Sequence, residues 1–282
     1  MQRPLVMGVL NLTPDSFSDG GEFTEVKAAL AQAKLLCEQG ANIIDIGGES
    51  TRPGADRIDS REEQARVLPT IQALKQAEWF AASKAIISID TMNADTALAA
   101  VAVGAELVND VSGGLADPKM HAAVADTKAK YVLSHWRGMQ THAALDYENI
   151  ARDVAAELAE QVAVAVANGI ARERIVIDPG LGFSKNQEQN WQLVARLDEL
   201  EKLGLPILVG ASRKRFIAGA LDAESPAEVS NSRRDLATAV LTALLMQRKL
   251  WGVRVHNVQA TVDAMNLVEA LEVAGAKPKE QS

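Results

Sequence analysis

Several short apolar segments of this chain end in acidic or amide side chains that could bind a flat heterocycle. Asp90, Asn109 and Asp178 each follow a run of leucine, isoleucine or valine residues. A carboxylate can accept two parallel hydrogen bonds from the N–H edge of an amino-pyrimidinone, and an amide can both donate and accept. A buried carboxylate is costly unless such bonds are made, so Asp90 and Asp178 indicate a ligand site rather than packing.

A second set of side chains is cationic and is suited to an anionic ligand. Its members are Arg52, Arg213, Lys214, Arg254 and His256. Arg254 and His256 are two residues apart, which would place both side chains on one face of a strand. Guanidinium and ammonium groups bind phosphate through charge-assisted hydrogen bonds, so this set predicts a phosphate-like group on the ligand.

Two loops contain the mixture of glycine, proline, hydroxyl and charged residues that is typical of a mobile cover over a substrate. They are residues 11–21 and residues 47–54. Loops of this composition often carry function, because they can bring polar groups over a bound ligand. We expect both to close over the site, and the alternative is that both are solvated connectors.

The elements that must position these groups are eight short strands separated by helical segments. The predicted strands are residues 5–11, 42–48, 85–91, 107–111, 130–135, 174–180, 206–212 and 252–257. Most are nearly continuous apolar runs, as in parallel strands that are covered on both faces. The helix signals between them include a predicted capping box over Ser60–Glu63 and a predicted N-cap at Asp117, before Pro118.

Eight β units without a dividing linker predict an α/β fold, a single (β/α)8 TIM barrel with its active site at the C-terminal ends of the strands. We assign residues 1–276 to this domain and residues 277–282 to a flexible tail. The strand ends of such a barrel meet at one mouth, which explains why polar residues follow every strand. Phosphate often binds near strands seven and eight, where the cationic residues lie. A doubly wound open sheet is the alternative fold.

The composition argues against several other classes of protein. The formal net charge is −8, which is unlike that of a protein that tracks nucleic acid. Cys37 is the only cysteine, so no intrachain disulfide can form, and its helical context predicts packing rather than nucleophilic chemistry. The chain has neither an apolar run of about 18 residues nor a signal pattern, so we expect a cytoplasmic protein without membrane contact.

Seven motifs follow one another along the chain in a specific order. They are Asn11-x-Thr13-Pro-Asp-Ser-Phe-x-Asp19-Gly-Gly, Gly-Gly-Glu-Ser-Thr51-Arg52-Pro-Gly, Ser-Ile-Asp90-Thr, Asn109-Asp, Asp178-Pro-Gly-x-Gly-Phe183-x-Lys185, Gly210-x-Ser212-Arg-Lys214 and Arg254-Val-His256. Together, over residues 7–272, they resemble the dihydropteroate synthases, the sulfonamide targets of folate synthesis. The resemblance implies a transferase that condenses 6-hydroxymethyl-7,8-dihydropterin diphosphate with 4-aminobenzoate and releases pyrophosphate.

The resemblance also implies roles for the matching positions. The pterin ring would be bound by Asp90, Asn109, Asp178 and Lys214. The diphosphate would be bound by Asn11, Arg254 and His256, with Asn11 also near a Mg2+ ion, the one cofactor implied. The 4-aminobenzoate pocket would include Thr51, Arg52, Pro53, Phe183, Ser212 and Lys214, and Gly210 would also lie at the substrate site. The catalytic set would be Asp90, Lys214, Arg254 and His256. The family further implies a homodimer formed through the later barrel helices.

Three other polar residues lie outside the two ligand-binding sets. Asp45 is expected to bond neighbouring loops rather than substrate, and His121 is expected at the surface of a helix. His135 ends the fifth strand and is equally consistent with a site role and with packing.

The chain departs from the family pattern at Ser134, Ser184 and Asn257, none of which is assigned to ring or charge recognition. Two alternative functions remain at this stage. A corrinoid-linked pterin methyltransferase would share the barrel and the acidic residues, but a methyl donor has no diphosphate for the cationic set to bind. A non-enzymatic pterin-binding paralogue would be expected to have lost loop or phosphate residues.

Overall fold

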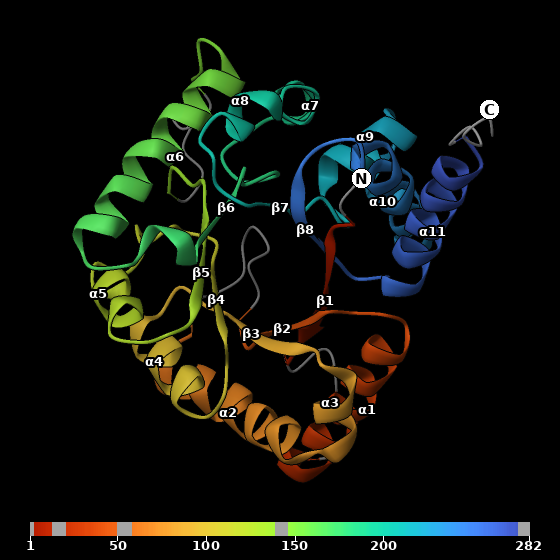
Figure 1. Cartoon of the computed structure of the whole chain (residues 1–282). Coiled ribbons are helices and arrows are strands. Elements are labelled where there is room, and N and C mark those ends of the chain that lie inside the picture. The colour runs from red at the N-terminus through yellow and green to blue at the C-terminus, as the bar shows by residue number, and fades with distance from the viewer. Residues whose placement is uncertain (1–2, 13–20, 50–57, 139–145, 276–282) are drawn as a thin grey trace, which may run out of the picture.

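The computed structural model describes residues 3–12, 21–49, 58–138 and 146–275, which fold as a closed parallel barrel of eight strands surrounded by helices (Figure 1). The strands are β1 (Leu5–Asn11), β2 (Ile43–Gly47), β3 (Ile86–Asp90), β4 (Leu107–Asp110), β5 (Lys130–Ser134), β6 (Ile175–Asp178), β7 (Ile207–Val209) and β8 (Leu250–Val255). They pair in sequence order, and β1 also pairs with β8, so the sheet has no free edge. The predicted TIM barrel is confirmed and the open sheet is excluded. The tail predicted for residues 277–282 lies outside the described residues.

The helices occupy the segments between the strands. They are α1 (Gly21–Glu38), α2 (Ser60–Gln76), α3 (Glu78–Ser83), α4 (Ala94–Ala102), α5 (Met120–Ala125), α6 (Ile150–Ala167), α7 (Gln187–Ala195), α8 (Asp198–Glu201), α9 (Arg215–Leu221), α10 (Asn231–Leu245) and α11 (Val258–Gly275), with 3-10 turns at Arg172–Arg174 and Pro226–Glu228. Figure 1 shows them outside the strands, where they cover the outer face of the barrel. This arrangement explains why the strands are apolar on both faces.

Two of the predicted helix starts are wrong in detail. The N-cap of α2 is Asp59, whose carboxylate accepts from the backbone N–H groups of Arg61 and Glu62 at 2.9 and 2.8 Å. Glu63 therefore does not close a capping box with Ser60, and its side chain is free to turn towards β3. The α5 helix begins at Met120 and not at Pro118.

The inner face of the barrel changes from apolar to polar along its axis. Its apolar layer is a buried cluster formed by Met7, Ile43, Leu107, Val132, Val176 and Leu208, from six different strands. Because side chains alternate across a strand, the next inward residue lies two positions further along. Those positions hold Asp45 after Ile43, Asn109 after Leu107, and Asp178 after Val176. The alternation thus brings the predicted polar residues together above one apolar floor.

Candidate active site at the barrel mouth

An ion-paired network links β2, β3, β4 and β8 at the mouth, which we define as the C-terminal ends of the strands. Arg254 donates from Nε to Asp45 Oδ2 at 2.6 Å and from Nη2 to Asp90 Oδ2 at 2.7 Å. Asp45 also accepts from Ser88 Oγ at 2.5 Å and from Asn109 Nδ2 at 3.1 Å. Asp45 is fully buried, so these bonds satisfy a charge that would otherwise be costly.

The charges of this network shift its protonation equilibria. Burial raises the pKa of Asp90 to about 7, while the charge of Arg254 opposes that shift. Burial alone would lower the pKa of Arg254, but the charges of Asp45 and Asp90 outweigh it and raise this pKa. Arg254 therefore stays protonated, whereas Asp90 can change its protonation state near neutral pH.

One carboxylate oxygen of Asp90 is available to a ligand. Asp90 Oδ1 is buried and has no hydrogen-bond partner within the part of the chain that the structure describes. An unpaired buried acceptor is unfavourable in a folded protein unless something else binds it. This oxygen lies at a strand end, on the carboxylate that Arg254 contacts, where it can accept a hydrogen bond from an N–H group of a ligand.

A second pair of opposite charges lies across the mouth, on β6 and after β7. Asp178 Oδ1 accepts from the backbone N–H of Gly180 at 2.7 Å, and the charge of Lys214 opposes the upward shift that burial produces in the pKa of Asp178. Burial lowers the pKa of Lys214 to about 8, with Asp178 acting in the opposite direction. Lys214 Nζ donates to the Leu181 carbonyl and lies 4.6 Å from the centre of the Phe183 ring.

Two glycines keep space open between these groups. A Cβ atom on Gly47 would lie 3.5 Å from Asn11 Oδ1 and 3.6 Å from Asp90 Oδ2. A Cβ atom on Gly210 would lie 3.5 Å from Asp178 Oδ2 and 3.9 Å from Lys214 Nζ. Any side chain at either position would fill volume directly beside the carboxylates, and the role of Gly210 towards a ligand stays a prediction.

The cationic set is only partly available for an anion. His256 lies one residue beyond β8, and its Nδ1 is 2.9 Å from Ser212 Oγ, so the structure brings these two predicted residues together. Arg213 instead makes two 2.8 Å hydrogen bonds to the carboxylate of Asp235, on α10. This ion pair holds the loop after β7 against α10, and the role of Arg213 towards an anion stays a prediction.

The remaining predicted residues fall into two groups. Asn11 is half-buried at the end of β1, next to Gly47. Thr51, Arg52 and Pro53 lie outside the described residues, as do most of the two predicted covering loops. The roles of all these residues towards ligands remain predictions.

Sequence reasoning missed residues that support the site from behind. Asp45 was expected to bond loops, but it joins Arg254 to Asn109. Glu63 accepts from Thr91 Oγ1 at 2.9 Å, just beyond β3. Lys185 was noted only as part of a motif, yet it is buried. A charged residue inside an apolar or glycine-rich run was the available signal for Asp45 and Lys185, whereas Glu63 lies in a charged run that carries no such signal.

Two histidines lie deeper in the fold than the other polar residues discussed above, and one of them contradicts its prediction. His121 is buried rather than exposed, and its Nε2 lies 3.1 Å from the Gly113 carbonyl, so the prediction of a surface residue is wrong. His121 lies on the inner side of the short α5 helix, and its ring packs edge-on against the Tyr131 ring. His135 is fully buried and bonds Lys185 and Glu157.

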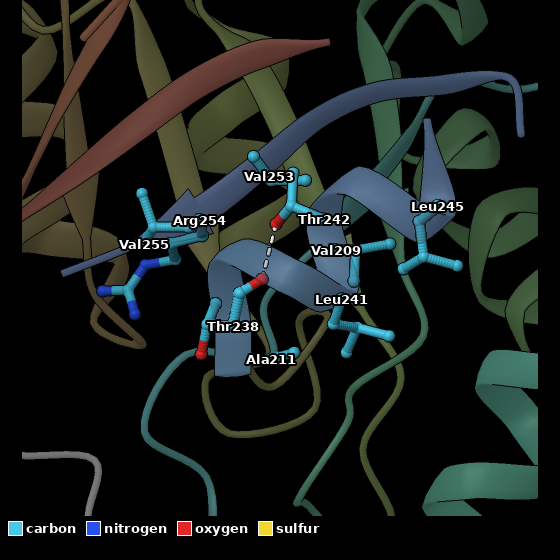
Figure 2. A pocket seen from close by; sticks show the side chains of 9 residues that line it. All are labelled: Val209, Ala211, Thr238, Leu241, Thr242, Leu245, Val253, Arg254 and Val255. Carbon is cyan, nitrogen blue, oxygen red and sulfur yellow. Dashed lines mark hydrogen bonds between the residues drawn. The ribbon is translucent and has the colours of Figure 1, made fainter. Parts of the chain in front are cut away.

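The small cavity in Figure 2 is a separate feature. It lies between α10 and strands β7 and β8 and is lined by Val209, Ala211, Thr238, Leu241, Thr242, Leu245, Val253, Arg254 and Val255. In Figure 2 the Arg254 guanidinium points away from Leu241 and Leu245. The cavity is therefore a packing gap behind the strands and not the substrate site.

Two other kinds of feature are absent from the described ranges. Within them, no group of three or more His, Cys, Asp or Glu side chains is arranged to hold a metal ion. None of the helices described is both long and apolar enough to span a bilayer.

Comparison with known proteins identifies the family. Residues 7–256 match the model of a family described as pterin binding enzyme. The chain is 46% identical over 273 residues to the dihydropteroate synthase of Mycobacterium leprae, covering 96% of this chain and 94% of the relative.

Solved structures show the same similarity. The dihydropteroate synthase of Xanthomonas albilineans with 4-aminobenzoic acid has 41% sequence identity and a TM-score of 0.85, covering 98% of this chain and 94% of that one. The Xanthomonas albilineans enzyme in complex with 7,8-dihydropteroate has 39% identity and a TM-score of 0.82, covering 98% and 95%. On its sequence and its fold, the chain belongs to the pterin binding enzyme family.

Proposed function

We infer that the chain is a transferase with dihydropteroate synthase activity. It condenses 6-hydroxymethyl-7,8-dihydropterin diphosphate with 4-aminobenzoate, giving 7,8-dihydropteroate and pyrophosphate in folate biosynthesis. The observation that carries this inference is the buried Asp90 oxygen that has no hydrogen-bond partner among the described residues and lies beside the guanidinium of Arg254. The Asp90 carboxylate can accept from the N–H edge of the pterin ring, and the Arg254 guanidinium can attract the diphosphate at the other end of the same substrate.

The pterin ring would bind among Asp90, Asn109 and Asp178. Asn109 Nδ2 donates to Asp45, so the amide oxygen of Asn109 is left to accept from the ligand. Asp90 Oδ1 would accept from the N–H edge of the ring, as would Asp178 from the opposite side. Lys214, between Asp178 and Phe183, would donate to a ring carbonyl or nitrogen.

The reaction breaks the C–O bond between the pterin methylene and the diphosphate and forms a C–N bond to the arylamine. The electron-rich pterin can support a cationic methylene, and the amine then attacks and loses one proton to solvent. Arg254 and His256 would stabilise the negative charge that develops on the leaving diphosphate. No covalent enzyme intermediate is needed, so positioning and charge stabilisation account for the catalysis.

The aminobenzoate would lie on the side of the mouth formed by Phe183, Lys214 and Ser212. The Lys214 ammonium already sits over the Phe183 ring, which leaves an aromatic face and a cation for a planar carboxylate. Thr51, Arg52 and Pro53 would complete this pocket. Because sulfonamides mimic 4-aminobenzoate, they would compete for the same place.

The donor set is compatible with Mg2+ bound together with substrate. Asn11 Oδ1 lies beside Gly47 and Asp90 at the mouth, and a single amide oxygen suits a cation that keeps several waters and binds substrate phosphates. Asn11 would hold the ion in this way. When bound, the ion would neutralise charge on the diphosphate.

A homodimer in the cytoplasm is also part of the proposal. Six large apolar side chains on α10 and α11 are 52–76% exposed: Leu236, Val240, Leu244, Leu267, Leu271 and Val273. On α10 the three are spaced by four residues, so they share one face of the helix. An apolar surface of this kind suits association with a second copy of the chain.

The proposal is tested by measuring pyrophosphate release with the pterin diphosphate, Mg2+ and 4-aminobenzoate, each omitted in turn. Release is expected only when all three are present. Tight pterin binding without release would instead identify a non-enzymatic paralogue, and transfer of a methyl group would identify a methyltransferase.

A further inference from the structure

The loop between β6 and α7 is anchored by a buried lysine. Lys185 Nζ lies 2.9 Å from His135 Nδ1, 3.0 Å from the Gly180 carbonyl and 3.0 Å from the Phe183 carbonyl. The residue is only 6% exposed. Three acceptors match the three N–H donors of an ammonium group, so this contact set fixes both ends of the loop segment at once.

The orientation of His135 depends on Glu157, on α6. His135 is fully buried, and its Nε2 is 2.9 Å from Glu157 Oε2. Burial, reinforced by the charge of Lys185, lowers the pKa of His135 to about 4, so the ring is neutral near pH 7. A carboxylate facing Nε2 places the single ring proton there, which leaves Nδ1 to accept from Lys185.

Ser184, beside this lysine, is held in an unusual backbone conformation. Its φ angle is +48°, which is uncommon for a residue with a Cβ atom. The Ser184 carbonyl accepts from Tyr147 Oη at 2.9 Å, and its hydroxyl accepts from the Arg137 backbone N–H at 3.3 Å. Such a conformation persists when its surroundings hold it, and here the segment before α6 does so.

The anchored loop shapes the mouth through Phe183 and Lys214. Phe183 lies between Gly182 and Ser184, and its ring contacts the Lys214 ammonium. A Cβ atom on Gly182 would lie 2.9 Å from Lys214 Cδ, so the loop backbone packs directly against the lysine stem. A shift of the loop would therefore move the phenyl ring relative to the ammonium group.

We propose that Lys185 is a positioning residue that holds Phe183 for the arylamine substrate, with His135, Glu157 and Tyr147 as its supports. The inference rests on the proposed synthase function. Lys185 does not touch substrate; it fixes the backbone on either side of the residue that does.

The test is steady-state kinetics on Lys185→Met, with each substrate varied in turn. Methionine has a similar length but cannot donate, so the loop loses three hydrogen bonds. The KM for 4-aminobenzoate should rise on the order of tenfold, since small displacements of a binding group are costly. The KM for the pterin diphosphate should change by less than about twofold. Lys34→Met, on the exposed side of α1, is the matched control and should behave as wild type.

The outcomes separate the inference from the function. If the wild-type enzyme shows no aminobenzoate-dependent release of pyrophosphate, the synthase function itself is contradicted. If the wild type is active, but Lys185→Met leaves the KM for 4-aminobenzoate unchanged or raises the KM values of both substrates equally, only the positioning role is contradicted.

A milder variant decides the matter if Lys185→Met does not fold. Tyr147→Phe removes only the hydroxyl that donates to Ser184. It should raise the KM for 4-aminobenzoate by about threefold, in line with the net contribution of one hydrogen bond. An aminobenzoate KM equal to that of wild type in this folded variant would overturn the proposal.

Discussion

Arg254 balances two buried carboxylates as well as facing the mouth, so its removal should affect both stability and turnover. In Arg254→Ala, Asp45 and Asp90 lose their shared cation. The free energy of unfolding should fall by about 3 kcal/mol, the cost of leaving a buried charge unpaired. The kcat/KM for the pterin diphosphate should fall by about 100-fold, because the leaving group loses a stabilising charge.

Urea unfolding and pyrophosphate-release kinetics check this prediction. Arg152→Ala, at an exposed position on α6, serves as the control. Full activity in Arg254→Ala would remove this residue from the mechanism, even if stability fell.

The shifted pKa values of Asp90 and Lys214 at the mouth predict a bell-shaped pH profile for kcat/KM. In the proposed role Asp90 accepts from the pterin with both oxygens as a carboxylate, so with a pKa of about 7 the rate should rise as pH increases through 7. Lys214 must be protonated to donate, so with a pKa of about 8 the rate should fall above pH 8. Asp90→Asn should lose the acidic limb, whereas Asp126→Asn, an exposed site after α5, should retain it. A profile flat from pH 6 to 9 would contradict these roles.

At the scale of single elements, the short strand β7 is followed directly by Gly210, which leaves space for a ligand at the mouth. The Cβ of Gly210→Ala would meet its neighbours at ordinary contact distances of 3.5 Å or more. The variant should fold with an unfolding temperature close to wild type. Its methyl group would occupy ligand space, so the Kd for the pterin diphosphate should rise about tenfold or more.

Calorimetric titration measures that affinity, and Gly275→Ala is the control because no atom of the described residues lies within 4 Å of its added Cβ. Wild-type affinity in Gly210→Ala would show that the space beside Asp178 does not hold the ring.

Most strands and helices were predictable from the sequence, but the hydrogen bonds between polar side chains on different elements were not. The strand β1 has the predicted bounds because its apolar run is continuous and ends in Asn11. The β8 strand begins at Leu250, two residues before the prediction, and ends before His256. The bond between Arg254 and Asp45 spans 209 positions and exists only because the barrel closes, so no local pattern could reveal it.

The same limit applied to Lys185. Its motif was visible in the sequence, but its depth of burial depends on β5 and α6 closing over the loop. The ion pair between Arg213 and Asp235 could not be predicted for a similar reason, since Asp235 lies on a helix that sequence spacing does not connect to Arg213.

At the scale of the whole molecule, the exposed apolar face of α10 and α11 predicts a dimer. The paired substitution Leu244→Glu with Leu271→Glu places charges on that face and should raise the dimer Kd at least about 100-fold. Val164→Glu, at an exposed apolar position on α6, should leave it unchanged. Sedimentation velocity measures the dimer Kd of the double variant and of the control. A wild type that is monomeric at working concentration would contradict the proposed interface.

At the barrel mouth Asp90 is paired with Arg254, and Asp178 lies across the mouth near Lys214, and the central claim is that one substrate binds between these two pairs. The most direct test is to quantify 7,8-dihydropteroate by mass spectrometry after incubating the enzyme with the pterin diphosphate, Mg2+ and 4-aminobenzoate. Wild type should form the product, and the nearly isosteric Asp178→Asn should form it at least about 100-fold more slowly. Absence of dihydropteroate with wild type, or an undiminished rate with Asp178→Asn, would contradict the account.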